Sequence, residues 1–209
     1  MKTMNSSSHW NKFYKTFNLK EETPFARFVI KKIIPRKKFL DIGCGNGRDT
    51  IFFKKKKLKV LGLDNSKIVI KMNKLKDKKI FKHFDFCNKK ISLNKFDYIY
   101  ARFFLHAINE KEEYNFFKNC KKISKQKSLI FLEFRTTKDS LFKKGKHISK
   151  YERVYGHYRR FIDTIEFKKK LKKLDFKLIY FKVGMKFALF NNEKPCVCRA
   201  IIQNSFQRK

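Results

Sequence analysis

The stretch Phe39-Leu40-Asp41-Ile42-Gly43-Cys44-Gly45-Asn46-Gly47-Arg48 decides the fold of this chain. It is the only place where three glycines stand at alternate positions directly after an apolar run, which indicates a buried strand ending in a tight turn. Glycine is needed where the backbone is left-handed or where a ligand approaches it closely. Residues 49–57 have helical character. A strand, a glycine turn and a helix N-terminus together predict a site for a nucleotide-like ligand.

The spacing of the glycines excludes two common phosphate-binding turns. A dinucleotide-binding turn reads G-x-G-x-x-G, whereas here G-x-G-x-G follows Asp41, and no Lys-Ser or Lys-Thr pair closes a P-loop. About 20 residues on, a second apolar strand at 58–63 ends in Asp64, where an acid usually binds ribose hydroxyls. Two strand-end acids around an uncharged turn favour a ligand without phosphates.

The order and spacing of these motifs resemble the class I S-adenosylmethionine-dependent methyltransferases over residues 39–133. In that family the D-x-G-x-G-x-G turn packs against the methionine part of the cofactor. The acid after the second strand bonds the ribose, and an acid after the third strand, here Asp85, bonds the adenine amino group. The resemblance implies S-adenosylmethionine as the cofactor. The implied cofactor-binding residues are Asp41, Gly43, Gly45, Gly47, Asp64, Asn65, Asp85, Phe86 and Ala101.

Apolar strands and amphipathic helices alternate along the chain, as in an α/β fold with crossover connections. Strands are expected before the glycine turn and at 58–63, 80–84, 96–100, 128–132, 177–183 and 196–203. The resemblance implies a Rossmann-like, mostly parallel seven-stranded sheet with an antiparallel C-terminal strand and helices on both faces. We expect a single domain over residues 1–209. It would include an N-terminal lid or helix segment at 1–35 and a substrate-side loop insertion at 136–162.

The net charge of +36 would suit nucleic acid or an anionic membrane as a partner, because bound phosphates release counterions. The excess is almost all lysine, however, and it is spread over every predicted helix and turn. We therefore interpret it as solvated surface, and nucleic acid is a disfavoured partner.

Cysteine usage and hydropathy indicate the compartment. The five cysteines contain no C-x-x-C and fit neither a disulfide framework nor a zinc site. No acid cluster beyond the cofactor acids indicates a metal. The sequence has no signal peptide and no apolar run of about 20 residues. We expect a cytoplasmic protein without membrane insertion, and nothing in the sequence indicates an oligomeric state.

Arginine is scarce, so its positions carry information that lysine does not. Arg102 and Arg135 follow the ends of the fourth and fifth strands, and the pair at 159–160 lies in the insertion. A guanidinium offers a planar fork for carboxylate or phosphate oxygens, so these positions predict a small acceptor with an anionic group. The alternative for Arg102 and Arg135 is a structural ion pair with Glu133 or Asp139. The expected substrate-binding residues are Arg102, Glu133, Arg135, Tyr158, Arg159, Arg160 and Tyr14.

The chemistry expected of the protein follows from the implied cofactor. Its sulfonium already activates the methyl group, so the protein mainly aligns and desolvates an oxygen or nitrogen nucleophile. A hydroxyl acceptor needs a base, for which His106 is the first candidate and His157 the second. An acceptor oxygen that is already anionic needs none, and His106 then becomes a hydrogen-bond donor.

The leading hypothesis is an S-adenosylmethionine-dependent methyltransferase for a small anionic metabolite, with surface-saccharide or secondary metabolism as the candidate setting. The fourth strand lacks the Asn/Asp-Pro-Pro-aromatic sequence of enzymes that methylate exocyclic amines of bases, so base methylation of that type loses support. The alternatives are an RNA methyltransferase and a non-catalytic S-adenosylmethionine-binding regulatory protein.

Overall fold

Strand β1 (Lys38–Ile42) lies inside a seven-stranded sheet in the computed structural model, which describes residues 20–189 and 193–205. The strand order is β3-β2-β1-β4-β5-β10-β9. The other six strands are β2 (Lys59–Asp64), β3 (Phe81–His83), β4 (Phe96–Arg102), β5 (Ser124–Arg135), β9 (Phe176–Gly184) and β10 (Val197–Asn204). Strands β1 to β5 pair in parallel, whereas β10 is antiparallel to both of its neighbours. The predicted fold class is confirmed.

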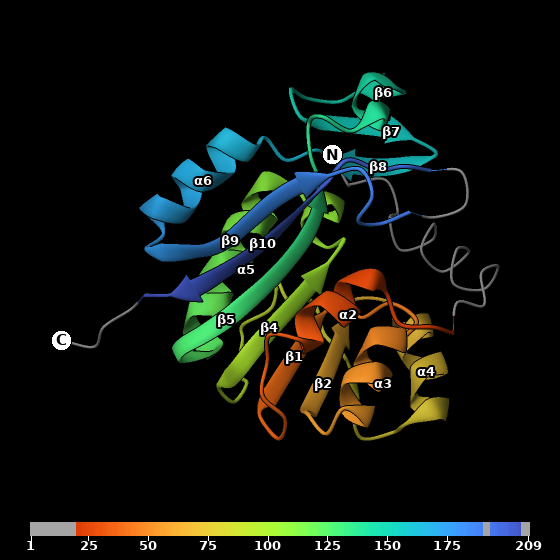
Figure 1. The fold of residues 1–209 in the computed structure, drawn as a ribbon. Coiled ribbons are helices and arrows are strands. Elements are labelled where there is room, and N and C mark those ends of the chain that lie inside the picture. Colours follow the sequence, from red (N-terminus) through yellow and green to blue (C-terminus); the bar gives the residue numbers. More distant parts are fainter. Residues whose placement is uncertain (1–19, 190–192, 206–209) are drawn as a thin grey trace.

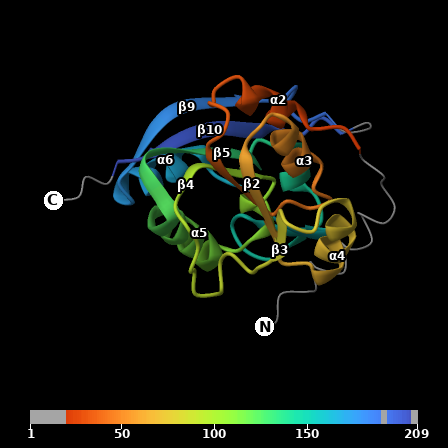
Figure 2. The same cartoon turned by 90° about the horizontal axis from the view of Figure 1, so that it is seen from below.

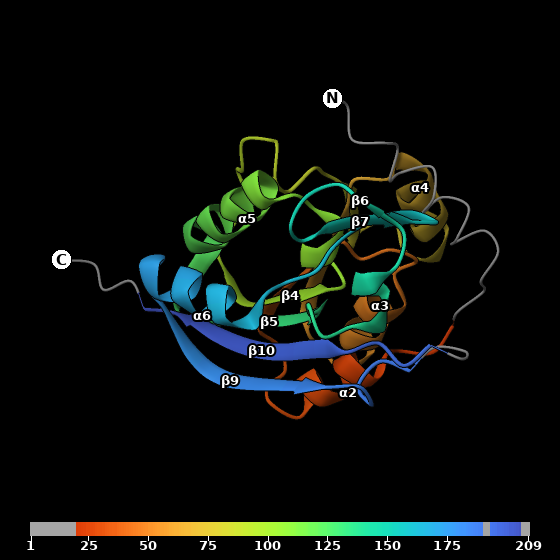
Figure 3. The same cartoon turned by 90° about the horizontal axis from the view of Figure 1, so that it is seen from above.

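Helices cover both faces of this sheet (Figures 2 and 3). Strand β1 shows why, since Phe39 packs into one buried cluster and Leu40 into another, as in a strand with both faces covered. The helices are α2 (Pro24–Ile30), α3 (Arg48–Lys55), α4 (Lys67–Lys76), α5 (Glu110–Ile123) and α6 (Thr164–Lys173). Helices α5 and α6 pack on the Leu40 face, and α2 and α3 pack on the Phe39 face.

Helices α2, α4 and α6 each begin at a local side-chain cap. The Thr23 hydroxyl accepts from the Ala26 N–H before α2, which has proline at its first position. Ser66 and Asp163 cap α4 and α6 in the same way. Helix α2 ends at Ile30. Within the described parts of the chain, no helix has the length and apolar character needed to cross a membrane.

The insertion at 136–162 is folded and is not an irregular loop. It contains a short 3-10 helix, η2 (Ser140–Lys143), and an antiparallel sheet of β6 (Lys146–His147), β7 (Glu152–Tyr155) and β8 (His157–Arg160). Gly156, with φ of 71°, forms the turn between β7 and β8. This small sheet lies beyond the carboxyl ends of β4 and β5 (Figure 1). Strands of two to four residues are too short to show a sequence period, so the pattern could not predict them.

A buried charge cluster ties three strands together at the same end of the large sheet. Glu133 on β5 is 1% exposed and accepts from Arg102 on β4 at 3.0 Å and from Arg199 on β10 at 2.7 Å. Burial raises the pKa of Glu133, and the two arginines oppose that shift. The structural ion pair considered for Arg102 is therefore present, and Glu133 supports the sheet from inside.

Candidate active site

A cavity of about 1130 Å³ opens at the carboxyl ends of β1, β2 and β4, where ligands bind in open α/β sheets. Its lining includes Gly43 from the glycine turn, Asp64 and Asp85 from the next strand ends, and Arg159 from the small sheet. One cavity thus joins the predicted cofactor and acceptor sites.

The glycine turn adopts the backbone that the sequence predicts, with positive φ at all three glycines. Gly43 has φ of 71°, and a Cβ there would meet Cδ2 of Phe104 at 2.7 Å. Gly43 lines the cavity, whereas Gly45 and Gly47 are not among its described lining residues. Gly47 instead makes room for the Phe81 ring, which a Cβ would meet at 2.6 Å. Of the three glycines, only Gly43 is among the described lining residues of the cavity.

Asp64 and Asp85 both line the cavity, and the backbone holds both carboxylates. Asp64 accepts from the Gly45 N–H at 3.0 Å and from the Ser66 N–H at 2.9 Å. Burial raises the pKa of Asp64, and these two bonds oppose the shift. Asp85 accepts from the backbone N–H groups of residues 87 and 88, each at 3.1 Å. Asn65 and Phe86 also line the cavity, whereas Ala101 is buried in the core.

Two buried acids stand beside the glycine turn. The Thr50 hydroxyl donates to Asp41 at 2.6 Å, and burial raises the pKa of Asp41 to about 8. Asp49, in the first turn of α3, accepts from the backbone N–H and hydroxyl of Thr23 and from the Tyr100 hydroxyl. Asp49 lines the cavity and was missed by the sequence analysis. An acid two residues after the third glycine was its only sequence signal.

Charged residues reach the cavity from several elements. Three arginines come from β4, β5 and β8, but Arg48 comes from α3, and the acids Glu112 and Glu193 lie outside the β1, β2 and β3 side. Lys20 is the only lysine among the described lining residues, in a chain with 54 lysines and arginines. Within residues 20–189 and 193–205, the lysine excess therefore lies outside the cavity lining.

His106 is buried in the wall of the acceptor side and is neutral. Its Nδ1 accepts from the backbone N–H of Arg135 at 3.3 Å, so the ring proton is on Nε2. Burial, with the charges of Arg135 and Arg159, holds the pKa of His106 well below its usual value. The Phe103 ring lies 4.8 Å from the imidazole, between centroids. His157 also lines the cavity.

The predicted acceptor arginines have different environments. Arg135 pairs with Asp139 and Glu193, so the structural alternative considered for it is also present. Arg160 is buried behind the wall, where it pairs with Glu113 and donates to two backbone carbonyls. Neither Arg160 nor Glu133 is among the described lining residues, so the structure does not place them against an acceptor. Arg102 and Arg135 do line the cavity.

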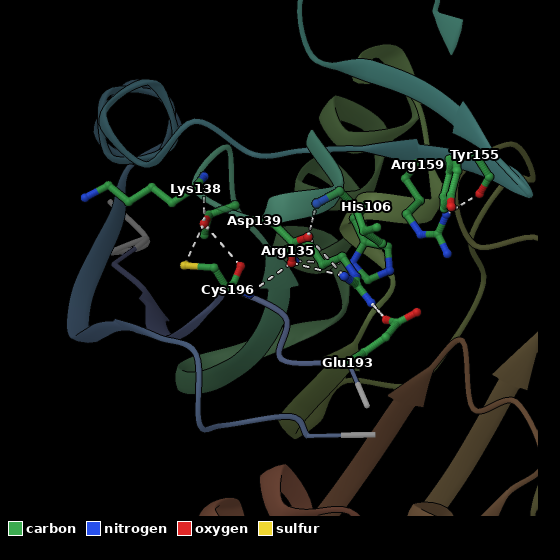
Figure 4. A network of polar contacts seen from close by, with 10 residues as sticks. His106, Arg135, Lys138, Asp139, Tyr155, Arg159, Glu193 and Cys196 are labelled. Carbon is green, nitrogen blue, oxygen red and sulfur yellow. Dashed lines mark hydrogen bonds and ion pairs between the residues drawn. The ribbon is translucent and has the colours of Figure 1, made fainter. Parts of the chain in front are cut away.

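Arg159 is partly buried, lines the cavity and donates to the Tyr155 carbonyl at 2.7 Å (Figure 4). It forms no ion pair with a carboxylate among residues 20–189 and 193–205. Burial, followed by the charge of Arg135, lowers the pKa of Arg159 to about 10, which leaves it charged at neutral pH. Tyr158 lines the cavity and donates to Glu152. Tyr14, with residues 1–19 of the predicted lid, lies outside the described residues.

The turn after β4 contributes two aromatic residues that the sequence analysis did not assign. Phe103 and Phe104 both line the cavity. Phe103 has φ of 54°, a left-handed conformation that is rare for a bulky residue and costs about 1–3 kcal/mol. No group of three metal-ligating side chains is placed to hold an ion in the described parts of the chain.

The chain matches one protein-family model over most of its length and shares its fold with several solved structures. A family model described as "Methyltransferase domain" matches residues 17–180. No curated protein matches the sequence. An S-adenosylmethionine-dependent methyltransferase from Methanosarcina mazei has 17% identity and a TM-score of 0.74, over 86% of this chain and 98% of the other.

Two further solved structures have the same fold at low identity. A TehB-like S-adenosylmethionine-dependent methyltransferase from Corynebacterium glutamicum has 17% identity and a TM-score of 0.67, over 96% of each chain. The glycopeptide N-methyltransferase MtfA, solved with S-adenosylmethionine, has 11% identity and a TM-score of 0.66, over 89% of this chain and 88% of the other.

Proposed function

The chain belongs to the methyltransferase-domain family of S-adenosylmethionine-dependent enzymes, and we propose that it methylates an oxygen or nitrogen of a small anionic metabolite. The observation that carries the acceptor proposal is the environment of Arg159. Its guanidinium faces the cavity, and in the described parts of the chain no carboxylate pairs with it. A partly buried guanidinium of this kind suits an anionic ligand, because the charge otherwise loses water without gaining a partner.

The cavity fits the family's cofactor. When bound, S-adenosylmethionine supplies a methyl group on a positively charged sulfur. Asp64 and Asp85 would hold its nucleoside part, because both carboxylates are fixed at neighbouring strand ends in one cavity. Gly43 lines the same cavity, and its bare Cα makes room for the Phe104 ring at that turn. Asp49 places negative charge beside the same turn, which favours a cationic ligand.

His106 would act as a hydrogen-bond donor and not as a base. A base needs an unprotonated nitrogen facing the acceptor, but the Arg135 N–H already occupies Nδ1, and Nε2 keeps its proton. An Nε2–H group stabilises an acceptor oxygen that is already ionised and aligns it for transfer. Of the two roles that the sequence left open for His106, this favours the hydrogen-bond donor, which goes with an acceptor oxygen that is already anionic. His157 stays the candidate base for a hydroxyl acceptor.

The test uses purified enzyme and pairs of candidate acceptors that differ only in a carboxylate or its neutral amide. We expect methylation of the carboxylate member. Arg159→Ala should raise the KM of that acceptor by about 10- to 100-fold, the value of one charged hydrogen bond. Arg159→Lys should recover only part of the loss, because lysine keeps the charge without the planar fork.

Calorimetry with S-adenosylhomocysteine provides the control for the Arg159 variants. Its affinity should be the same in both variants and in the wild type, because Arg159 lies on the acceptor side. A parallel loss of cofactor affinity would indicate a structural role for Arg159, and equal turnover of amide and carboxylate would refute the anionic acceptor. The RNA alternative has less support, because Lys20 is the single lysine among the described lining residues of the cavity.

A further inference from the structure

Arg135 holds two carboxylates at the edge of the cavity, and they differ in how firmly they are fixed (Figure 4). Its Nη1 donates to both oxygens of Asp139, at 3.1 and 3.0 Å. Its Nη2 donates to Glu193 at 2.5 Å. The Asp139 side chain has no exposed surface, whereas that of Glu193 is 50% exposed and lines the cavity.

Asp139 is a permanent partner of Arg135. Besides the guanidinium, its carboxylate accepts from the Leu141 N–H at 3.0 Å and from the Cys196 N–H at 2.9 Å. The Glu193 carboxylate has Arg135 as its one hydrogen-bond partner among the described residues. A half-exposed ion pair of this kind contributes little to stability, so the Glu193 carboxylate can be displaced at small cost.

The charges of Arg159 and of the groups that act on it balance only while Glu193 is present. Arg135 and Arg159 contribute two positive charges, and Asp139 and Glu193 contribute two negative charges that both act on Arg159. His106 adds none, because it is buried and neutral. If the Glu193 side chain turns outward, the cluster has one unbalanced positive charge beside the cavity.

We propose that Glu193 occupies the place of the acceptor's anionic group, and that an acceptor with a single carboxylate displaces it from Nη2 of Arg135. The incoming carboxylate restores the charge balance, which a dianion would exceed. It also finds Arg159 on the same wall, so two guanidiniums can bind it. This inference rests on the proposed function, and it narrows the acceptor class to monocarboxylates.

The experiment measures binding of acetate, as the simplest monocarboxylate, to the full chain. Acetate replaces chloride at constant ionic strength, acetamide is the uncharged control, and the 15Nε signals of Arg135 and Arg159 report binding by NMR. Glu193→Gln removes the competing charge and keeps the side-chain shape. Glu166→Gln is the matched control, because Glu166 lies on α6 and forms an exposed ion pair with Lys150, so the change removes the same charge away from the cavity.

We expect acetate to shift both arginine signals in the wild type, and to bind about fivefold tighter to Glu193→Gln, which corresponds to loss of a half-exposed ion pair. Glu166→Gln should match the wild type. Equal affinity in wild type and Glu193→Gln, or equal tightening in both variants, would overturn the displacement. Absence of any acetate-specific shift at Arg159 in either protein would overturn the anionic site itself, and with it the acceptor part of the proposed function.

Discussion

Replacement of Gly43 by alanine tests whether the glycine turn needs its bare Cα for contact or only for backbone conformation. Gly43 and Gly156 have the same φ of 71°, so an alanine at either position adopts the same unfavourable left-handed conformation. They differ in their surroundings. A Cβ at Gly43 would meet the Phe104 ring at 2.7 Å, whereas a Cβ at Gly156 would have nothing within 4 Å. Gly156→Ala is therefore a matched control.

The magnitudes follow from these two environments. The left-handed backbone alone should cost each variant about 1–2 kcal/mol of unfolding free energy. Gly43→Ala must also move the Phe104 ring, which packs 5.4 Å from the Phe116 ring between centroids. Overpacking of this kind adds about 1–3 kcal/mol. We therefore expect a loss of about 2–5 kcal/mol for Gly43→Ala and about 1–2 kcal/mol for Gly156→Ala.

Urea unfolding measures both losses, and calorimetry with S-adenosylhomocysteine measures the effect on the cofactor site. Affinity should fall at least about tenfold in Gly43→Ala and stay unchanged in Gly156→Ala. Adding Phe104→Leu to Gly43→Ala should recover the steric part of the stability loss, which a double-mutant cycle isolates. Equal stability losses in the two alanine variants would refute the close-contact argument. Unchanged cofactor affinity in Gly43→Ala would refute the assignment of the turn.

Three further predictions concern charge. The pKa of Asp41 is about 8 in the folded chain against 3.8 as reference, so the folded state holds an extra proton between these values and loses stability as pH rises through that window. Urea titrations should therefore show that the free energy of unfolding of Asp41→Asn exceeds that of the wild type by an amount that grows from about pH 4 to pH 8 and then levels off. A difference that does not depend on pH would contradict the raised pKa of the buried Asp41 carboxyl. Arg160→Ala leaves Glu113 buried with Lys170 as its remaining ion-pair partner, so the free energy of unfolding should fall by about 3 kcal/mol. The control Lys150→Ala removes one side of an exposed pair and should leave the free energy of unfolding unchanged. Equal stability of the two variants would contradict the role of Arg160 behind the cavity wall. RNA binding at low salt should disappear by about 0.2 M salt in a filter-binding assay, and retention there would support the RNA alternative.

Helix starts and cofactor acids could be predicted from the sequence because their determinants are local. Thr23, Ser66 and Asp163 each cap a helix through a bond to a backbone N–H two or three residues on. Asp64 and Asp85 follow apolar strands directly, and parallel strands bring such ends together. The spacing of residues in the sequence was therefore enough to predict both the helix caps and the strand-end acids.

The roles of the arginines could not be predicted, because their partners are distant in sequence. Arg135 meets Glu193 across 58 residues, and Arg160 donates to the Ile108 carbonyl across 52. Only the folded chain shows that Arg160 lies behind the wall while Arg159, its neighbour, faces the cavity. Alternation along β8 separates the two, and a strand of four residues gave no pattern from which to predict that alternation.

The Glu133 cluster has a consequence for how homologous chains can diverge. Losing Glu133 would leave two guanidiniums facing each other, and losing Arg102 or Arg199 would weaken the neutralisation of a carboxylate that is 1% exposed. Substitutions at the three positions are therefore expected to occur together. Homologous chains should either keep Glu133, Arg102 and Arg199 or have apolar residues at all three positions.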